Sequence, residues 1–561
     1  MAAAVGNDDV KGSAMGNTLK SMNTTRLRLK YKNLAIFICM LAIQGALVYG
    51  FYVREHWFSN LRLSYLTEVY LPTYDYALAS GIFGDPKSLF PSYNVTYHFS
   101  PTLSVPVLLY HGVMEEADDE NINISRFREH MFTLKSAGYE TVSLEDFYDF
   151  LKGNKNLPTK SFLLTFDDGR KDSYYPVDPI LKALNYEATI FIITNTLDLK
   201  KSSYYLSSRE IEQMERSGRW TIGSHSVNGH GSIEIDNQGE SAPFFSNLRW
   251  LSQPELISGG RLEESDEFTA RITKDLIDSR KRLENLLDKP IISFAFPFGD
   301  FGERTVNFPE VAGIVIERAR QIYSILFFQF ATGKIYSQNY FYSQIYTGGS
   351  VGGSDEGTLV KRIGVDANWT GEKLLHVLET GAAKPLPHHD NFSTDRGWAS
   401  TNWGVVEFFP SRLRLAARSE GSGSVAILDG SRLWKNYEVK ADVVWPKGSN
   451  IYLWGRVQDS GNYAACNFGK SLVHVEQVVG GGKVKVIRGE THDNIFPEEG
   501  FEIGMRAHGR TIECLLNGEV LVATEFLDES LSEGGIGFKT WDAEFNNSEL
   551  IIRDVSVQEL L

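Results

Sequence analysis

Cysteine is scarce in this chain of 561 residues, which contains only Cys39, Cys466 and Cys514. This number excludes a disulfide framework and a pair of CxxC zinc knuckles. Cys466 and Cys514 could pair if their strands are neighbours. Small buried cysteines are common, however, so two free thiols in the core are the expected outcome.

Basic charge and internal repetition are also lacking. Lysine and arginine number 56 against 71 aspartates and glutamates, a formal net charge of −15. Broad nucleic-acid binding needs a Lys/Arg-rich surface that releases counterions, so this composition argues against a nucleic-acid partner and favours a neutral or cationic one. No repeat of roughly 20–50 residues occurs, which argues against solenoids and propellers. A hydrophobic fraction of 42% argues against wholesale disorder, and the length suggests two or three domains.

One long apolar run is present near the N-terminus. Residues 34–53, LAIFICMLAIQGALVYGFYV, carry no charge over 20 positions, enough helix to cross a hydrocarbon layer of roughly 30 Å. Basic residues precede the run, so the positive-inside rule places residues 1–33 in the cytoplasm as a tail. A cleaved signal peptide is the alternative, but its apolar region is usually about 7–15 residues long. We therefore predict a single-pass cell-membrane anchor, with the remainder periplasmic or extracellular.

After a predicted juxtamembrane connector at 54–102, the hydrophobic pattern indicates two further regions. In residues 103–385, apolar runs such as VPVLLY and SFLLTF alternate with helical patterns, one of them at 267–287. This alternation predicts an α/β domain with parallel strands, whose site lies in the loops after the strands. Residues 386–561 show period-two alternation and an Asn517-Gly518 turn, which predict an all-β sandwich.

Two polar clusters follow buried strands. Asp167 and Asp168, in TFDDG, come directly after the run SFLL. Adjacent carboxylates on an extended chain point in different directions, so one can bind a metal ion while the other handles a proton. Alone, an Asp-Asp-Gly is more often a plain turn. His225 and His230, in SHSVNGH, follow the run WTIG, and two histidines with one aspartate form a set that holds a divalent ion with open positions.

Two further clusters complete the pattern: PVLLYHGV at 106–113 and FAFPFGDFG at 294–302. In this order the four clusters resemble the polysaccharide deacetylase family, also called the NodB-homology domain or carbohydrate esterase family four. Their order is similar to that of its circularly permuted poly-N-acetylglucosamine deacetylases. The resemblance covers 103–383 and implies a distorted TIM-like β/α barrel. It also implies a hydrolase that removes N-acetyl groups from an N-acetylhexosamine-containing exopolysaccharide.

The resemblance also assigns roles to residues. It implies Asp167 as general base and His111 as general acid, with Asp168, His225 and His230 as metal ligands. The metal would be divalent, with Zn²⁺ in first place and Ni²⁺, Co²⁺ or Fe²⁺ as alternatives. An alternative acid is the histidine of LLH at 374–376, but that segment has a helical pattern.

Two departures from the family pattern stand out. The third family motif, R-x-P-Y, appears here as AFPF at 295–298, so the arginine that orients the catalytic aspartate is missing. Arg170 is our expected replacement, and the predicted substrate contacts are Tyr110, Arg170, Phe296, Pro297 and Phe298. The segment 231–266 is longer than usual in the family and could form a lid or a partner surface. Its aromatic side chains could stack on sugars or pack the segment onto the barrel.

The C-terminal region resembles concanavalin-like jelly-roll domains of the laminin-G and glycan-binding type. The resemblance implies carbohydrate binding through exposed aromatic side chains. Its tryptophans are individually more typical of a core than of a binding platform; they are Trp403, Trp434, Trp445, Trp454 and Trp541. The predicted partners are an acetylated polysaccharide and envelope polysaccharide synthesis or export proteins. Two alternative functions stay open: a non-catalytic glycan-binding scaffold, and an esterase that removes O-acetyl groups.

Overall fold

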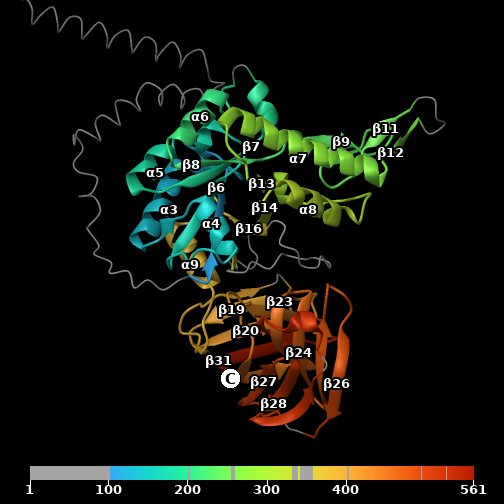
Figure 1. The fold of residues 1–561 in the computed structure, drawn as a ribbon. Coiled ribbons are helices and arrows are strands. Elements are labelled where there is room, and N and C mark those ends of the chain that lie inside the picture. The colour runs from blue at the N-terminus through green and yellow to red at the C-terminus, as the bar shows by residue number, and fades with distance from the viewer. Residues whose placement is uncertain are drawn as a thin grey trace, which may run out of the picture. The chain divides into compact units, whose positions relative to one another are not determined.

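The computed structural model describes an α/β domain and an all-β domain (Figure 1). The described residues are 102–199, 202–253, 259–330, 339–340, 358–400, 403–493, 496–525 and 527–560. The predicted cytoplasmic tail, the membrane segment 34–53 and nearly all of the connector 54–102 lie outside the described residues. Among the helices that the structure does describe, none is both long and apolar enough to cross a membrane.

Seven parallel strands form the closed barrel of the α/β domain. They are β2 (Val107–Tyr110), β6 (Ser161–Phe166), β7 (Ala188–Ile192), β8 (Trp220–Ser224), β13 (Ser293–Ala295), β14 (Ile325–Phe330) and β16 (Thr358–Gly364). Each strand pairs with the next in that order, and β16 pairs with β2, which also pairs with β6. The short strand β5 (Glu140–Thr141) extends the sheet beside β6. The predicted β/α barrel is therefore present.

Continuous apolar runs form these strands because both of their faces are buried. In β2 and β6 every residue is buried, as expected for parallel strands with helices on one side and a packed interior on the other. Side chains in the barrel interior, among them Leu163, Phe191 and Phe327, form one buried apolar cluster with residues of α4 (Leu144–Leu151). The outward-facing side chains pack against helices, which surround the strands in Figure 1.

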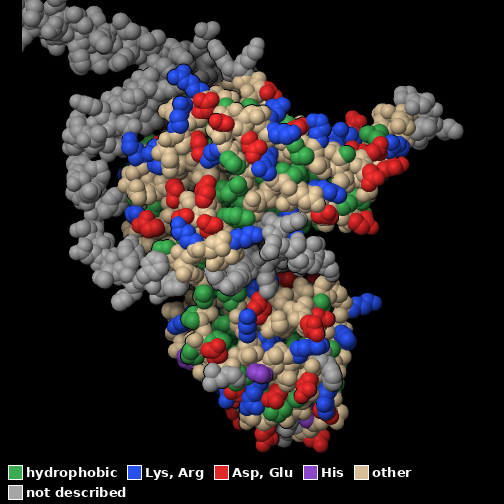
Figure 2. Space-filling view, in the orientation of Figure 1, with side chains coloured by type: hydrophobic (Ala, Val, Ile, Leu, Met, Phe, Trp, Pro, Cys, Tyr) green, Lys and Arg blue, Asp and Glu red, His purple; other side chains and the backbone are tan. Residues whose placement is uncertain are grey.

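Helices cover the barrel: α3 (Ile124–Ser136), α5 (Asp178–Leu184), α6 (Ser208–Arg216), α7 (Ser265–Leu287), α8 (Val311–Ile322) and α9 (Gly371–Gly381). The predicted helix at 267–287 is confirmed as α7, whose residues Phe268, Ile272, Leu276 and Leu283 are fully buried. A capping box between Glu264 and Glu267 begins this helix. On the face shown in Figure 2, acidic and basic side chains are interspersed over the barrel.

Two antiparallel sheets form the all-β domain, as the period-two alternation predicts. The first sheet contains β19 (Val405–Phe409), β20 (Arg412–Ala416), β31 (Glu549–Glu559), β22 (Tyr437–Lys447), β27 (Phe501–His508), β28 (Thr511–Leu516) and β29 (Glu519–Thr524), and β17 (His388–Asp390) pairs with β31. The second sheet contains β18 (Trp398–Ser400), β21 (Gly423–Leu428), β30 (Gly535–Trp541), β23 (Asn450–Asp459), β24 (Asn462–Gly469), β25 (Leu472–Val478) and β26 (Lys485–Thr491). Asn517 and Gly518, both at positive φ, form the predicted turn between β28 and β29.

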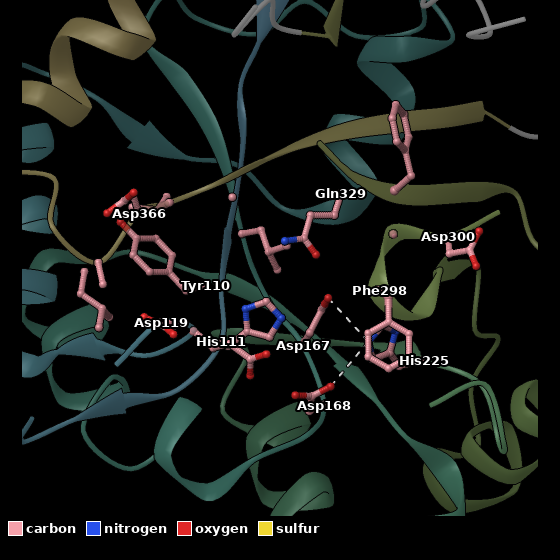
Figure 3. A pocket seen from close by; sticks show the side chains of 18 of the residues that line it. Tyr110, His111, Asp119, Asp167, Asp168, His225, Phe298, Asp300, Gln329 and Asp366 are labelled. Atoms are coloured by element: carbon pink, nitrogen blue, oxygen red, sulfur yellow. Dashed lines mark ion pairs between the residues drawn. The ribbon is translucent and has the colours of Figure 1, made fainter. Parts of the chain in front are cut away.

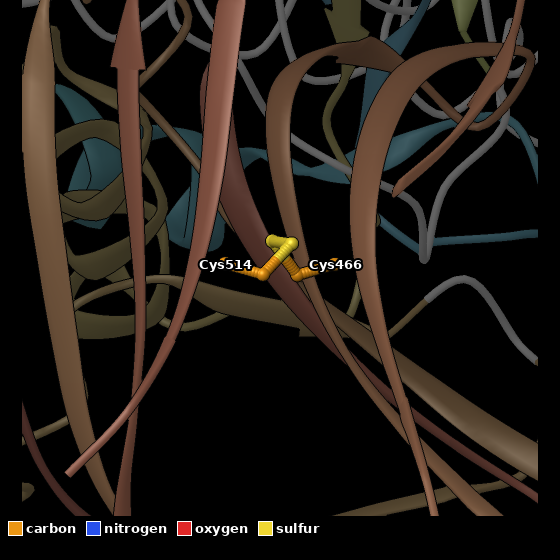
Figure 4. The surroundings of a disulfide bond; sticks show 2 residues. All are labelled: Cys466 and Cys514. Atoms are coloured by element: carbon orange, nitrogen blue, oxygen red, sulfur yellow. A yellow bond between two sulfur atoms is a disulfide. The ribbon is translucent and has the colours of Figure 1, made fainter. Parts of the chain in front are cut away.

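The expectation of two free thiols in this domain is wrong. Cys466 on β24 and Cys514 on β28 form a disulfide, with their Cα atoms 5.6 Å apart (Figure 4). The two strands belong to different sheets, so the cysteines are not neighbours within a sheet. Both side chains point into the core between the sheets, where the alternation of each strand brings them face to face. The disulfide therefore joins the two sheets.

Removing this disulfide should lower the stability of the sandwich. The bond closes a loop with a sequence separation of 48 residues, and cross-links of this kind contribute roughly 2–4 kcal/mol by restricting the unfolded chain. We expect the Cys466→Ala/Cys514→Ala variant to unfold at a correspondingly lower urea concentration than the oxidised chain. Urea unfolding with and without a reductant measures this effect. An unchanged midpoint in both comparisons would contradict the prediction.

Candidate active site

The predicted chemical residues meet at one end of the barrel because its strands are parallel. Tyr110 ends β2, while Asp167 and Asp168 follow β6. His225 follows β8, and Phe298 lies just after β13. In a parallel barrel the carboxyl ends of the strands share one rim, where loops can carry a site. Figure 3 shows the labelled side chains Asp167, Asp168 and His225 pointing toward one another at this rim.

Asp167 is held by an arginine that the sequence reasoning missed. Arg362 lies on β16 and is fully buried, and its guanidinium donates to both carboxylate oxygens of Asp167 at 2.6 and 2.7 Å. Burial alone would raise the pKa of the Asp167 carboxyl. Arg362 and His225 outweigh burial and hold this pKa below its ordinary value. Asp167 is therefore a carboxylate of fixed orientation at neutral pH.

The structure brings Asp168, His225 and His230 together. His230 Nε2 lies 3.2 Å and His225 Nε2 3.7 Å from Asp168 Oδ1. His225 Nδ1 donates to the Ala295 carbonyl at 2.7 Å, which leaves Nε2 free to face the carboxylates. Burial lowers the pKa of His225 to about 4, against the opposite effect of Asp167. The His225 imidazole is therefore neutral at pH 7, as a metal ligand must be.

These three residues fit a divalent metal ion. One ligand atom from each lies within 4.8 Å of the other two. Two imidazole nitrogens and one carboxylate oxygen suit Zn²⁺ and also Fe²⁺, Co²⁺ or Ni²⁺, and such a set leaves coordination positions for water and substrate. Asp168 and Ser226 both have positive φ values, 73° and 72°. Strained backbone of this kind clusters at functional sites, because the surrounding structure must hold it in place.

The loop between the two histidines is organised by Asp275 on α7, which the sequence reasoning also missed. Its Oδ1 accepts from Ser226 Oγ at 2.5 Å and from the Val227 backbone N–H at 3.2 Å. Its Oδ2 accepts from the backbone and side-chain nitrogens of Asn228 at 2.8 and 3.1 Å. Ser226 Oγ in turn accepts from the Gly229 N–H. One buried carboxylate therefore fixes the loop that presents both imidazoles.

Replacing Asp275 by alanine should weaken metal binding, although Asp275 itself contacts no ligand atom of the proposed metal. The change leaves the buried donors of Ser226 and Asn228 without their acceptor, so the loop loses its fixed geometry. Loss of such supporting contacts typically lowers metal affinity about 10–100-fold. Metal titration of the purified chain measures the loss. Asp278→Ala, on the exposed side of the same helix, is the matched control and should change nothing; equal affinities in the two variants would contradict the prediction.

A pocket of about 910 Å³ opens over these groups. In Figure 3 its lining has His111 and Tyr110 on one side and Phe298 on the other, with Asp167 and Asp168 between them. His225 and His230 also line the pocket. The Tyr110 hydroxyl forms a hydrogen bond of 3.0 Å with Nδ1 of the buried His130. Acidic residues are numerous along the lining: Asp118, Asp119, Glu120, Asp300, Glu303 and Asp366.

Several predicted site residues lie elsewhere. Arg170 pairs with Asp172 through two hydrogen bonds of 2.9 and 2.7 Å, so the prediction that it replaces the missing arginine is wrong. Arg362 binds the Asp167 carboxylate instead. Phe296 and Pro297 are buried and do not line the pocket, because the turn after β13 exposes only Phe298. The alternative acid, His376, lies on α9 and contacts Asp395, away from the pocket.

Part of the segment 231–266 packs onto the barrel. Its described residues form two hairpins, β9 (Ser232–Glu234) with β10 (Ser241–Pro243) and β11 (Trp250–Ser252) with β12 (Gly260–Leu262). Phe244 and Phe245 are buried, and the Phe245 ring packs against Phe296. None of the described residues of this segment lines the pocket. Of the two readings of the insertion's phenylalanines, packing against the barrel is therefore the correct one.

A parallel β/α barrel with this donor set is compatible with a metal-dependent hydrolase, and comparison with known proteins supplies the family of the domain. Residues 154–315 match the family model described as polysaccharide deacetylase. The chain therefore contains a polysaccharide deacetylase domain, which confirms the resemblance seen in the motifs. The predicted enzyme class, a hydrolase acting on carbon–nitrogen bonds other than peptide bonds, agrees with this family.

Relatives of this domain share about a quarter of its residues. A poly-beta-1,6-N-acetyl-D-glucosamine N-deacetylase of Escherichia coli K12 is 26% identical over 239 residues, 40% of this chain and 33% of the relative. A protein of the same name from Staphylococcus aureus MRSA252 is 25% identical over 202 residues, 36% of this chain and 61% of the relative. The chain thus spans a third to three fifths of these relatives. A solved de-N-acetylase from Aggregatibacter actinomycetemcomitans is 23% identical, with a TM-score of 0.39, over 49% of this chain and 99% of that one.

Proposed function

We propose that this protein is a metal-dependent deacetylase that removes N-acetyl groups from a polysaccharide containing N-acetylhexosamine. The observation that carries the proposal is the convergence of Asp168, His225 and His230 beside the arginine-bound carboxylate of Asp167, in a pocket at the carboxyl end of the barrel. The relatives named above support the choice of substrate, since both are named as poly-N-acetylglucosamine N-deacetylases.

Different residues of the chain would hold the metal ion and carry out the two proton transfers of hydrolysis. A divalent ion held by Asp168, His225 and His230 would polarise the amide carbonyl and lower the pKa of a water molecule to about 7. Asp167, ionised and oriented by Arg362, takes the proton of the attacking water. His111, on the other side of the pocket from Phe298, protonates the leaving nitrogen as the carbon–nitrogen bond breaks. One water and one acetamido group thereby give acetate and a free amine.

Phe298 is the proposed platform for the sugar ring. Its side chain is 47% exposed, and its ring centroid lies 5.1 Å from that of His230. A pyranose can place its apolar C–H face on such a ring while its acetamido group reaches the metal site. Tyr110 contributes mainly by fixing the strand end that precedes His111, since its hydroxyl is already bonded to His130.

The geometry of the site argues against one alternative function, the scaffold, but does not distinguish the other, the O-acetyl esterase. Two features favour a non-catalytic scaffold: the missing motif-three arginine and the β-sandwich. Arg362 removes the first, because it binds the Asp167 carboxylate from another strand; the sandwich is compatible with a scaffold and with an enzyme. An O-acetyl esterase would use the same groups. The two reactions differ in the leaving group, an alkoxide instead of an amine, so the choice of substrate separates them.

The experiment is an acetate-release assay with the purified chain on matched glycans. We expect release from an N-acetylated glucosamine polymer, with the appearance of one free amine for each acetate. An O-acetylated polymer without acetamido groups serves as the comparison. Release from the O-acetylated polymer alone would identify an esterase. The scaffold would be favoured if no acetate appeared from any glycan and no divalent ion copurified with the chain.

We further propose that the domains act outside the cytoplasm and that residues 34–53 anchor them to the membrane. The disulfide between Cys466 and Cys514 supports an oxidising compartment, and the uncharged run of 20 residues supports the anchor. Protease treatment of intact cells should digest the C-terminal domains and spare a tag on residues 1–33. Envelope polysaccharide synthesis or export proteins are the proposed neighbours.

A further inference from the structure

One polar side chain of the pocket has no role in the hydrolysis proposed above. Gln329 lies on β14, one residue before the strand ends at Phe330, and its half-buried side chain lines the pocket. Figure 3 shows its carboxamide directed from the strand toward the region where Asp167 and His111 lie. The carboxamide therefore faces the part of the pocket in which the acetamido group would react.

The alternation of side chains along β14 explains why Gln329 faces the pocket. Phe327, two residues earlier, belongs to the apolar cluster of the barrel interior, and Phe328 belongs to the cluster that packs outside the strands. Because successive side chains of a strand point to opposite faces, Gln329 points inward like Phe327. It lies closer to the carboxyl end of the strand, where the apolar interior gives way to the pocket.

The pairing of β14 with β16 places Gln329 beside the arginine that holds the proposed base. Gln329 lies opposite Arg362 in this pairing. Both terminal nitrogens of Arg362 donate to Asp167, whereas its Nε is buried and has no partner among the described residues. The Gln329 oxygen therefore does not bind Arg362, and its carboxamide is not part of the network that orients Asp167.

The hydrogen-bonding capacity of Gln329 is unused within the protein. In the parts of the chain that the structure describes, its carboxamide has no hydrogen-bond partner. A carboxamide offers two N–H donors and one oxygen with two lone pairs. Asn368, also in the pocket lining, is exposed. A substrate that displaces water from the half-buried Gln329 must supply hydrogen bonds in its place.

Close packing fixes Gln329 next to the proposed sugar platform. Gly299 follows Phe298 at a positive φ of 68°. A Cβ atom on Gly299 would lie 2.6 Å from the Cβ and 2.7 Å from the backbone nitrogen of Gln329, so a larger residue would clash there. The turn that carries Phe298 thus packs directly on β14, and a sugar stacked on Phe298 would lie next to the Gln329 carboxamide.

We propose that Gln329 makes the site specific for an amide by accepting a hydrogen bond from the N–H of the acetamido group. This inference rests on the proposed function, in which the leaving nitrogen faces His111. An acetamido nitrogen carries one hydrogen, whereas the bridging oxygen of an acetate ester carries none. The Gln329 oxygen therefore binds the amide, and in the ester it meets only another acceptor.

The groups that carry out hydrolysis do not make this distinction themselves. Asp167, His111 and a bound metal ion would hydrolyse an ester as well as an amide, because the ester is the more reactive of the two. A site that hydrogen-bonds one polar group of its substrate rejects an analogue that lacks this group, because the protein atom is then left unpaired. Gln329 is thus a specificity-determining residue of the site.

The test compares two short oligosaccharides, one carrying acetamido groups and the other carrying O-acetyl groups at the same ring position. The measured quantity is the ratio of kcat/KM for the amide to kcat/KM for the ester, in the full metal-loaded chain. Gln329→Met keeps the length of the side chain and removes the oxygen, so it should lower this ratio about 10-fold, as expected for one hydrogen bond. Gln329→Glu keeps an accepting oxygen and should retain the ratio, although its charge slows both reactions.

Gln321→Met is the matched control, because Gln321 is exposed on α8 and does not line the pocket. Its ratio should equal that of the unaltered chain. Gln329→Ala makes the same comparison if Gln329→Met does not fold.

Two results would overturn the proposal. In the first, Gln329→Met loses both activities equally, which would indicate a structural role or a hydrogen bond to the carbonyl oxygen that both substrates share. In the second, the ratio falls as far in Gln329→Glu as in Gln329→Met. Failure of the proposed function is a separate result, the absence of acetate release from the acetamido substrate by the unaltered chain, and it would remove this inference as well.

Discussion

Asp168→Asn is expected to abolish both divalent-metal binding and acetate release. Asp168 Oδ1 lies close to both imidazole Nε2 atoms. The neutral amide of asparagine removes the negative charge that balances the ion, and it places either an oxygen or an N–H donor toward the histidines. Because metal catalysis supplies several kcal/mol of transition-state stabilisation, the rate should fall at least about 10³-fold. Metal analysis and acetate release measure the two effects.

Asp119→Asn provides the control for this variant. Asp119 lines the same pocket and loses the same charge, but it lies outside the set of three ligands. We expect Asp119→Asn to keep its bound metal and most of its activity. If Asp168→Asn also kept both, the assignment of the metal ligands would be wrong.

The second large effect is expected from Arg362→Met. The substitution leaves the carboxylate of Asp167, which is 2% exposed, without its partner in the barrel interior. Removing one member of a buried ion pair typically costs about 3–5 kcal/mol, because the other charge remains buried and unpaired. The free energy of unfolding should fall by that amount. Activity should be lost as well, since Asp167, the proposed general base, loses its orientation.

A double-mutant cycle separates the stability effect from catalysis. Asp167→Asn removes the unpaired charge, so Arg362→Met/Asp167→Asn should be more stable than the sum of the two single changes predicts, by about 1–3 kcal/mol. Its activity should stay absent, because no base remains. Arg170→Met tests the residue that pairs with Asp172 instead, and its coupling to Asp167→Asn should be close to zero. Additive stability changes for Arg362 and Asp167 would contradict this view of the pair.

The sequence was sufficient to predict the barrel, the sandwich and the clustering of Asp168, His225 and His230, for a physical reason. Asp168, His225 and His230 each follow a buried run closely, and parallel strands deliver such positions to one rim. Strand alternation likewise predicts which side of β22 is buried, since Tyr437, Val439, Ala441 and Val443 lie in the core. Local pattern and topology together determine these features.

Arg362 could not be assigned from local pattern. It binds Asp167 across 195 residues of chain, and only closure of the barrel brings β16 beside β2, which in turn pairs with β6. The sequence contains one indication of this pair, the arginine within the run TLVKRIG. A buried strand accommodates an arginine only where a carboxylate pairs with it. Asp275 carries a similar signal, because it shares the buried side of α7 with Ile272 and Leu276.

The disulfide contradicts the expected free thiols because it joins strands of two different sheets. Cys466 and Cys514 lie on opposite sheets, so their contact depends on how the two sheets stack and on which face each cysteine occupies. The hairpin at Asn517-Gly518 gives the direction of β28 but not its position across the core. The alternation of side chains along one strand therefore cannot predict which residues touch across the two sheets.

The most direct test of the central claim is acetate release from an N-acetylated glucosamine polymer by the full chain, before and after removal of bound metal. We expect steady release by the purified protein, loss of release after chelation, and recovery when Zn²⁺ or another divalent ion is returned at one equivalent per chain. Release that continues undiminished in the chelated, metal-free protein would contradict the account.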